Sequence, residues 1–185
     1  MRKIPTLFQR DPDDRAHVLP VVHPDCQWVI DGKGTPTRKW DGTCTRLDDA
    51  GEWWARREVK PGKNPPAHYV AEEHDATTGK TVGWEPIAQS AFAKFHAEAL
   101  TLENITRPGT YELLGPKING NPDQFGQHVL VLHGWAPFSE RNDFATAPRD
   151  YDGLREWLLA RPQYEGIVWH FDGHMAKLKR RDFPA

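Results

Sequence analysis

The sequence predicts an α+β fold in which antiparallel sheets are flanked by helices. Most predicted strands are joined by short turns, which connect antiparallel neighbours, and only two segments have the periodicity of helices. The 185 residues are 38% hydrophobic and 27% charged, which is typical of a globular domain with a sizeable core. We therefore expect one domain over residues 27–185, preceded by an extended, polar lead-in over residues 1–26.

In the first half of the chain, strand patterns alternate with turn signals. The turn at residues 48–51 joins two strand patterns and so predicts a hairpin. The predicted elements are a strand over 27–31, a strand pair or bent strand around Gly42 within 38–47, a strand over 52–59, a loop over 61–66, and a strand over 69–73 that ends at the turn 75–79.

The second half contains both predicted helices. Apolar residues recur with a period near 3.6 over residues 87–102, which predicts the clearest helix. Asp150 is the predicted N-cap of another helix that extends to about residue 160. The remaining elements are buried strands over 109–114 and 128–135, a loop over 115–126 between them, and a final hairpin of 164–171 and 175–179 over a turn at 172–173.

The composition argues against several classes of protein. A net charge of −2 does not suggest a protein that coats nucleic acid. No apolar run approaches the ~20 residues that span a bilayer, and the N-terminal residues show no signal peptide. Two cysteines give no disulfide framework, so we expect a cytoplasmic monomer without a membrane partner. Basic residues still cluster, at Arg56, Arg57, Lys60 and Lys63, and at Lys177, Lys179, Arg180 and Arg181.

Three short motifs occur in order along the chain. Residues 39–42 are Lys-Trp-Asp-Gly, residues 165–168 are Glu-Gly-Ile-Val, and residues 177–179 are Lys-Leu-Lys. The first motif alone arises often by chance, whereas all three in this order are specific. Together they resemble motifs I, IV and V of the covalent nucleotidyltransferases, which include polynucleotide ligases and mRNA capping enzymes. The resemblance implies a ligase/capping-enzyme adenylation domain, in which a lysine attacks the α-phosphate of a nucleoside triphosphate.

By this resemblance Lys39 is the catalytic nucleophile. A free lysine has a pKa of about 10.4 and is mostly protonated at neutral pH, so attack requires neighbouring cations or a bound metal. Lys177 and Lys179 are the expected cations, and their i, i+2 spacing places both side chains on one face of a strand. Glu165 matches the motif IV glutamate, which the resemblance implies acts through a divalent metal, Mg²⁺ or Mn²⁺.

Other residues match nucleotide-binding positions of the superfamily. Gly42 lets the backbone turn tightly after the nucleophile, and Asp41 can orient that turn. Glu112 resembles the motif III glutamate, which contacts the ribose of the nucleotide. A glutamate in an apolar strand is also compatible with an ordinary edge position, although burial would require a partner for its carboxylate.

An arginine and an aromatic residue complete the predicted nucleotide site. Either Arg56 or Arg57 corresponds to a ribose-contacting arginine, and only one of them can face the site because adjacent strand residues point to opposite sides; Arg56 is preferred. Trp135 or Phe138 is expected to stack on the base. ATP is the expected nucleotide, although Thr37, two residues before the nucleophile, leaves the choice between ATP and GTP open.

The three motifs and the candidate nucleotide-binding residues together look most like the small RNA ligases of the RNA ligase 1 type. This resemblance covers roughly residues 25–182. The resemblance implies an ATP-dependent RNA ligase that joins RNA 5′-phosphate and 3′-OH ends through a lysyl-AMP intermediate and an RNA 5′-adenylate, for RNA repair. DNA ligases and capping enzymes carry an OB-fold domain after motif V, and this sequence ends soon after Asp182, which favours RNA. The alternatives are a self-nucleotidylating enzyme that acts on DNA or another acceptor, and a non-catalytic module that binds nucleotide or RNA.

Overall fold

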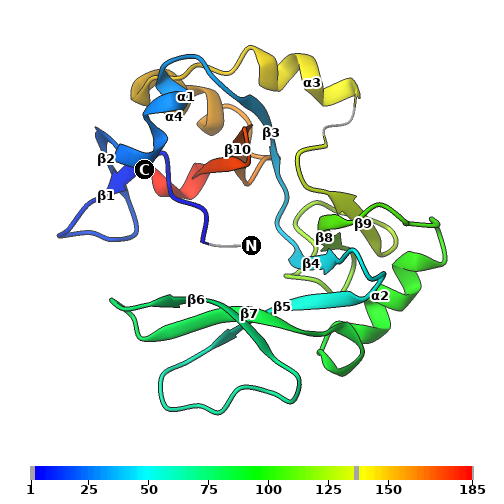
Figure 1. The fold of residues 1–185 in the computed structure, drawn as a ribbon. Coiled ribbons are helices and arrows are strands. Elements are labelled where there is room, and N and C mark those ends of the chain that lie inside the picture. Colours follow the sequence, from blue (N-terminus) through cyan, green and yellow to red (C-terminus); the bar gives the residue numbers. More distant parts are fainter. Residues whose placement is uncertain (1–2, 136–137, 185) are drawn as a thin grey trace. The chain divides into compact units, whose positions relative to one another are not determined.

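The computed structural model describes residues 3–135 and 138–184 (Figure 1). The chain forms two compact units: unit 1 consists of Met1–Lys3 and Asp41–His133, and unit 2 of Ile4–Trp40 and Gly134–Ala185. Among the described residues, all paired strands are antiparallel and four α-helices accompany the sheets. The prediction of an α+β fold with antiparallel sheets is confirmed, and the boundary at residue 26 stays a prediction.

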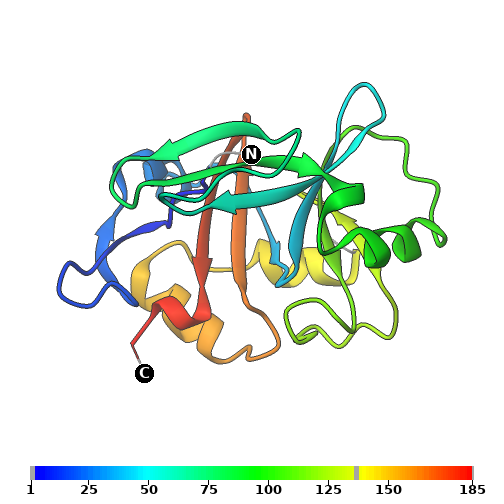
Figure 2. The same cartoon turned by 90° about the horizontal axis from the view of Figure 1, so that it is seen from below.

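Unit 2 contains a three-stranded sheet in the order β11–β10–β3 and a two-stranded sheet of β1 and β2. β10 (Gly166–Phe171) and β11 (His174–Lys179) form the predicted final hairpin and run side by side in Figure 2. β3 (Thr35–Lys39) pairs with the other edge of β10. The other elements are β1 (Phe8–Arg10), β2 (Val18–Val22), α1 (Gln27–Ile30), α3 (Phe138–Ala145), α4 (Tyr151–Leu159) and two 3₁₀ turns, η1 (Pro24–Cys26) and η3 (Arg180–Asp182).

Residues near the N-terminus extend this sheet. The N–H of Leu7 donates to the carbonyl of Lys177 at 2.8 Å, and the N–H of Lys177 donates to the carbonyl of Pro5 at 3.0 Å. Leu7 and the following Phe8 are buried at 0% and 2% exposure. The early residues therefore contribute both backbone pairing and apolar side chains to unit 2.

The three-stranded sheet has one apolar face. Successive residues of a strand point to opposite faces, and Ile167, Trp169 and Leu178 on one face are fully buried. They belong to a single core cluster with Leu154 and Leu158 of α4. Because the core fixes one face, the alternation leaves the intervening residues on the other.

α4 confirms the second predicted helix. The carboxylate of Asp150 accepts a hydrogen bond from the N–H of Gly153 at 2.8 Å, which satisfies a backbone donor that has no partner within the helix. Leu154, Trp157 and Leu158 are buried on one side of the helix. The cap and the apolar stripe together position α4 on the core.

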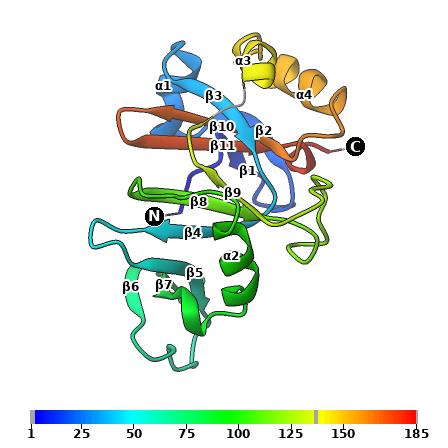
Figure 3. The ribbon, with the colours of Figure 1, turned by 90° about the vertical axis from the view of Figure 1, so that its right-hand side faces the viewer.

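Unit 1 is built on a six-stranded sheet in the order β6–β7–β5–β4–β8–β9. β4 (Thr43–Leu47) and β5 (Trp53–Val59) form the predicted hairpin, and β8 (Gly109–Leu114) pairs with the other edge of β4. Figure 3 shows α2 (Ala93–Leu100) beside this sheet. The remaining elements are β6 (Val70–Asp75), β7 (Lys80–Pro86), the 3₁₀ turn η2 (Ile87–Gln89) and β9 (Val129–Leu132).

α2 covers one face of the unit 1 sheet. Its buried residue Ala99 belongs to an apolar cluster with Leu47, Tyr111 and Leu113 of the sheet. Glu112 lies between Tyr111 and Leu113 in β8, so strand alternation directs it to the opposite face. The fold of unit 1 thereby separates the apolar cluster from the predicted motif III glutamate.

The predicted strand over residues 27–31 is wrong, because residues 27–30 form α1 and Asp31 caps its C-terminus. Pro24 begins the preceding 3₁₀ turn, and the indole N–H of Trp28 donates to the carbonyl of Asp25 at 2.9 Å. The N–H of Asp31 donates to the carbonyl of Gln27 at 3.0 Å. So short an apolar run carries too little periodicity to distinguish a helical turn from a strand.

The predicted helix over residues 87–102 is shorter than expected. Residues 87–89 form η2, and Ser90 then adopts extended backbone with ψ of 159°. The hydroxyl of Ser90 donates to the carbonyl of Ile87 at 2.9 Å and accepts from the N–H of Phe92 at 3.2 Å. Such local side-chain bonds compete with helical ones, so α2 begins only at Ala93.

The sequence analysis predicts no strand or helix at β1, β2, β7 and α3. Pro20 lies within β2 and Gly83 within β7, and both residue types weaken a strand pattern. α3 has little amphipathic character, so its sequence lacks the apolar stripe that identifies a helix. Each of these elements depends on tertiary packing more than on its local pattern.

Burial of His96 predicts a pH-dependent stability. Burial lowers the pKa of this imidazole from 6.5 to about 4; the residue is 3% exposed, and its ring lies edge-on to Trp53. The unfolded chain therefore binds a proton that the folded chain does not bind between about pH 6.5 and 4. We expect the free energy of unfolding contributed by this group to be fully present above pH 6.5 and to decrease on acidification by at most about 1.4 kcal/mol per pH unit.

Urea unfolding at a series of pH values measures this effect. His96→Phe should lose less stability than the wild type between pH 7 and pH 4.5. His174→Gln changes an exposed histidine and should keep the wild-type dependence. Parallel pH profiles for the wild type and His96→Phe would contradict the assignment.

Candidate active site

Glu165 forms ion pairs with two lysines in unit 2. Its Oε2 accepts a hydrogen bond from Nζ of Lys39 at 2.5 Å, and its Oε1 lies 2.6 Å from Nζ of Lys179. The three side chains are only 12% to 19% exposed, so solvent screens these charges less than it screens charges on the open surface. The structure thus brings together three residues that the sequence separates widely.

The register of the sheet explains this meeting. Gly166 begins the central strand β10 and is paired with Lys39 on one side and with Lys179 on the other. Glu165 directly precedes this glycine, so its carboxylate can reach both lysines. A Cβ at Gly166 would lie 2.1 Å from the carbonyl oxygen of Leu178. A glycine is therefore needed for the close approach of β10 and β11 at this point.

Lys177 lies on the same face of β11 as Lys179, with the buried Leu178 between them. Its register partner on β10 is Val168, which pairs on its other side with Thr37 of β3. Thr37 is 3% exposed, and its hydroxyl lies 3.3 Å from the carbonyl of Val168 and 3.0 Å from Nε2 of His170. The polar face of the sheet therefore combines the lysines with a partly buried hydroxyl–imidazole pair.

Glu112 is held by two contacts within unit 1. Its Oε1 accepts the N–H of Gly42 at 3.1 Å, and its Oε2 lies 2.8 Å from Nε2 of His133. The other ring nitrogen of His133, Nδ1, lies 2.9 Å from the hydroxyl of Thr110. The half-buried carboxylate thus has the hydrogen-bonding partners that such a group needs.

His133 is a site residue that the sequence analysis did not identify. Glu112 pairs with Val131 across β8 and β9, and residues 131 and 133 share one face of an extended chain. Both strands are predictable from their composition, whereas their register is not. A correct register would have placed His133 beside Glu112.

Asn119 fixes the backbone that follows the nucleophile motif. Its Nδ2 donates to the carbonyl of Gly42 at 2.7 Å and to Oδ1 of Asp41 at 3.3 Å. A Cβ at Gly42 would lie 2.3 Å from the carbonyl oxygen of Leu113. The close approach of β8, and not only a turn, therefore requires a glycine in this motif.

The register of unit 1 separates Arg56 from Arg57. Arg56 follows Ala55, which pairs with Thr45 on the Tyr111 side of the sheet, so alternation directs Arg56 to the Glu112 side. Its Nε is buried and has no hydrogen-bond partner in the described part of the chain. Arg57 is exposed and lies 4.0 Å from Glu85. The geometry favours Arg56 as the arginine on the face of Glu112.

Cys44 lies opposite Glu112 in the β4–β8 pair. Burial, and after it the charge of Glu112, raises the pKa of the Cys44 thiol to about 12. A thiol that stays protonated is a poor nucleophile. Cys44 is therefore not a candidate nucleophile.

Trp135, one of the two aromatic residues expected to stack on the base, is 49% exposed. Phe138 is the first residue of α3, and its side chain lies outside the described part of the structure. An exposed indole is available for stacking on a base. The nucleotide-binding assignments of Asp41, Gly42, Arg56, Arg57, Glu112, Trp135 and Glu165 stay predictions.

Glu165 is the candidate ligand for a divalent cation. The described residues contain no group of three or more His, Cys, Asp or Glu side chains that could hold a metal ion. A single carboxylate nevertheless fits Mg²⁺, or Mn²⁺, that binds together with a nucleotide, because Mg²⁺ is often held by one or two carboxylates and substrate phosphates. Such an ion would depend on the nucleotide for its other ligands.

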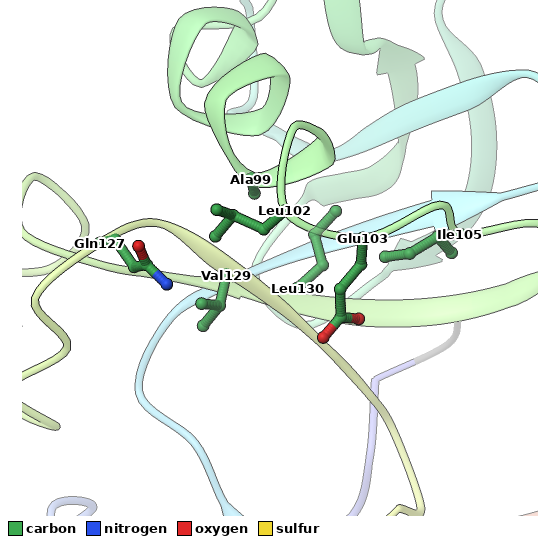
Figure 4. Close-up of a pocket in the computed structure, with 7 residues that line it drawn as sticks. All are labelled: Ala99, Leu102, Glu103, Ile105, Gln127, Val129 and Leu130. Carbon is green, nitrogen blue, oxygen red and sulfur yellow. The ribbon is translucent and has the colours of Figure 1, made fainter.

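A separate cavity of about 280 Å³ lies in unit 1 near the end of α2 (Figure 4). Its lining is mostly aliphatic, with Leu102, Ile105 and Val129, and its two polar side chains are Glu103 and Gln127. None of the predicted site residues lines it. We therefore assign this cavity no part in the reaction.

Comparison with known proteins identifies the family. A family model described as RNA ligase 1 matches residues 89–184, which is more than half of the chain, so the chain belongs to the RNA ligase 1 family. Membership makes the protein an ATP-dependent RNA ligase, an enzyme that forms phosphoric-ester bonds and takes RNA as its substrate. No curated protein matches the chain. The matched segment contains Glu112, Glu165, Lys177 and Lys179, whereas Lys39 precedes it.

Across residues 3–135 and 138–184, no helix combines the length and the apolar character needed to cross a membrane.

Gly166→Ala should destabilise the protein. The added Cβ meets the backbone of β11 at 2.1 Å, and a clash with backbone cannot be relieved by a change of side-chain rotamer. We expect a loss of about 1–3 kcal/mol in the free energy of unfolding, which is typical of overpacking, measured by urea denaturation.

Gly126→Ala is the matched control, because a Cβ at that position has no atom within 4 Å. Its effect should stay within about 0.5 kcal/mol. Equal unfolding free energies for the two variants would show that β10 and β11 do not need the glycine.

Proposed function

We propose that the protein joins an RNA 5′-phosphate to an RNA 3′-OH through an AMP carried on Lys39. The observation that carries this proposal is the pairing of Glu165 with both Lys39 and Lys179 on the polar face of the unit 2 sheet. The family supplies the reaction class and its nucleotide. We infer that the α+β chain is an adenylation domain of the ligase and capping-enzyme type, and that it serves RNA repair.

In the first step, Nζ of Lys39 attacks the α-phosphorus of ATP. A P–N bond forms, the bond from the α-phosphorus to the bridging oxygen of the β-phosphate breaks, and pyrophosphate leaves. Nζ must first lose a proton, because an ammonium has no lone pair for attack.

Lys179 and Lys177 supply positive charge where the phosphate gains negative charge. Fixed cations near a reacting phosphoryl group stabilise its transition state. Glu165 would hold Mg²⁺ or Mn²⁺, and the bound ion would neutralise phosphate charge as a Lewis acid. Occupation of the carboxylate by a cation would also leave Lys179 available to phosphate.

The later steps use the same lysine as a leaving group. An oxygen of the RNA 5′-phosphate attacks the phosphorus of lysyl-AMP, the P–N bond breaks, and Lys39 recovers its proton as the RNA 5′-adenylate forms. The 3′-OH of a second RNA end then attacks the 5′-phosphate, loses its proton, and displaces AMP. Each step exchanges one bond at phosphorus, so no oxidant or reductant is required.

Lys39→Arg should abolish the covalent nucleotide adduct. Arginine keeps the positive charge but stays protonated at any working pH, so it cannot attack. After incubation with ATP and Mg²⁺, intact-mass spectrometry of the wild type should show one added AMP, and peptide mapping should place it on Lys39.

Lys33→Arg, which changes a lysine of unit 2 outside the motifs, should label normally. The wild type treated with excess EDTA should remain unlabelled, because no divalent cation would then offset the repulsion between the Glu165 carboxylate and the phosphates. Equal labelling of Lys39→Arg would assign the nucleophile to another residue, and full labelling in EDTA would remove the metal from the proposal.

RNA strands should be joined faster than matched DNA strands. A ribose 2′-OH gives a protein an additional hydrogen-bonding group by which RNA is distinguished from DNA. Two 5′-phosphorylated strands of the same sequence, one ending in ribose and one in deoxyribose, give the comparison in a gel assay. The net charge of −2 and the few clustered cations lead us to expect weak joining at high salt.

A protein that seals the all-DNA strands equally well or faster would instead be a nucleotidyl-transferring enzyme with a DNA acceptor. Replacing ATP with GTP in the same assay decides the base preference. Transfer of AMP without sealing would indicate a different acceptor for the nucleotide.

A further inference from the structure

We propose that Arg38 is a positioning residue that fixes the Lys39–Glu165 pair for reaction. This inference rests on the proposed role of Lys39 as the nucleophile. Arg38 precedes Lys39 on β3, so the two side chains point to opposite faces of the sheet. Arg38 therefore acts from the far side of the strand and touches neither nucleotide nor RNA in this proposal.

The guanidinium of Arg38 is held by three kinds of contact. Its Nη1 donates to Oε1 of Glu140 in α3 at 2.7 Å, and its Nη2 donates to the carbonyl of Gln163 at 3.1 Å. Its central carbon lies 3.9 Å from the centre of the Trp40 ring and 5.0 Å from that of Tyr164. Both distances lie within the range of cation–π contacts. The two rings therefore restrict the plane of the guanidinium.

These contacts involve the sequence neighbours of both members of the ion pair, Lys39 and Glu165. Arg38 and Trp40 flank Lys39, so stacking between them clamps the backbone on either side of the nucleophile. Gln163 and Tyr164 immediately precede Glu165, so their contacts with Arg38 fix the backbone that delivers the carboxylate. One guanidinium thus connects the two segments whose side chains meet at 2.5 Å.

A second ion pair, between Arg161 and Asp143, stabilises the segment that precedes Glu165. Arg161 donates to Asp143 of α3 through Nε and Nη2 at 3.2 Å and 3.0 Å, and the hydroxyl of Tyr164 donates to Asp143 at 3.1 Å. Tyr164 is therefore held from its ring by Arg38 and from its hydroxyl by Asp143. α3 supplies the acidic partner of both arginines, Glu140 for Arg38 and Asp143 for Arg161. This helix therefore holds the segment that precedes Glu165.

The contacts require the shape of arginine as well as its charge. A guanidinium is planar, stacks on aromatic rings and donates in two directions at once, whereas a lysine ammonium offers one compact charge. The side chains of Arg38 and Glu140 are only 12% and 17% exposed. A lysine at this position would keep the charge near Glu140 but lose the stacking and the bond to Gln163.

Arg38→Lys should slow formation of the lysyl-AMP adduct with little effect on ATP binding. A displacement of about 1 Å at a reacting atom can cost up to ~100-fold in rate, so we expect a decrease of at least about 10-fold at saturating ATP. The ATP concentration at half-maximal rate should change by less than about 3-fold, because Arg38 does not contact the nucleotide. Rapid-quench measurement of adduct formation, at a temperature where circular dichroism shows a folded protein, gives both quantities.

Arg149→Lys is the matched control. Arg149 belongs to unit 2 and donates to the backbone carbonyls of Val29 and Gly34 at 2.8 Å and 2.9 Å, so its loss should lower the melting temperature without a comparable effect on rate. A wild-type rate for Arg38→Lys would overturn the proposal. An equal loss of rate in Arg149→Lys would also overturn it, because the effect would then be general destabilisation.

A second measurement does not depend on catalysis. Without nucleotide, Lys39 should react with an amine-directed acetylating reagent several-fold faster in Arg38→Lys than in the wild type, with the exposed Lys94 as the internal reference. An unchanged Lys39/Lys94 ratio would overturn the positioning role. If the wild type forms no adduct on Lys39, the proposed function fails separately, and the labelling ratio still decides whether Arg38 positions the pair.

Discussion

The structure of unit 2 depends on one carboxylate shared by two lysines. Glu165 pairs with Lys39 at 2.5 Å and with Lys179 at 2.6 Å, in surroundings where loss of the carboxylate would leave two partly buried lysine charges without this partner. The two lysines come from the outer strands of the sheet, and the glutamate precedes the central strand. Displacement of any strand would therefore separate a partner from the carboxylate.

The apolar core and the polar face of the sheet cannot be changed independently. Ile167 and Leu178 are buried on one face, and the intervening residues are consequently directed to the other. A shift of one residue in register would exchange the faces and place lysines in the core. The packing of the core therefore sets the positions of the polar groups as firmly as their own hydrogen bonds do.

The sequence predicted the family better than it predicted contacts. The motifs selected Lys39, Glu165 and Lys179, which the structure brings together, and the lysine spacing predicted their shared face on β11; the roles of these residues stay predictions. The partners of Arg38 and the contact of His133 with Glu112 required strand register and the placement of α3, and local periodicity determines neither. The error at residues 27–31 has the same cause, because a short apolar run is compatible with a helical turn and a strand.

The pairing of Glu165 with Lys39 and Lys179 also affects how the site can accept ATP. In the proposed reaction the triphosphate approaches the same two lysines that pair with Glu165 in this structure. Two ammonium groups near one another without an anion would repel each other and favour opening of the strand ends. Glu165 removes that repulsion while no nucleotide is bound, and a divalent cation arriving with the triphosphate can take the carboxylate in exchange. In this proposal the negative charge of Glu165 offsets lysine charge before the triphosphate supplies its own.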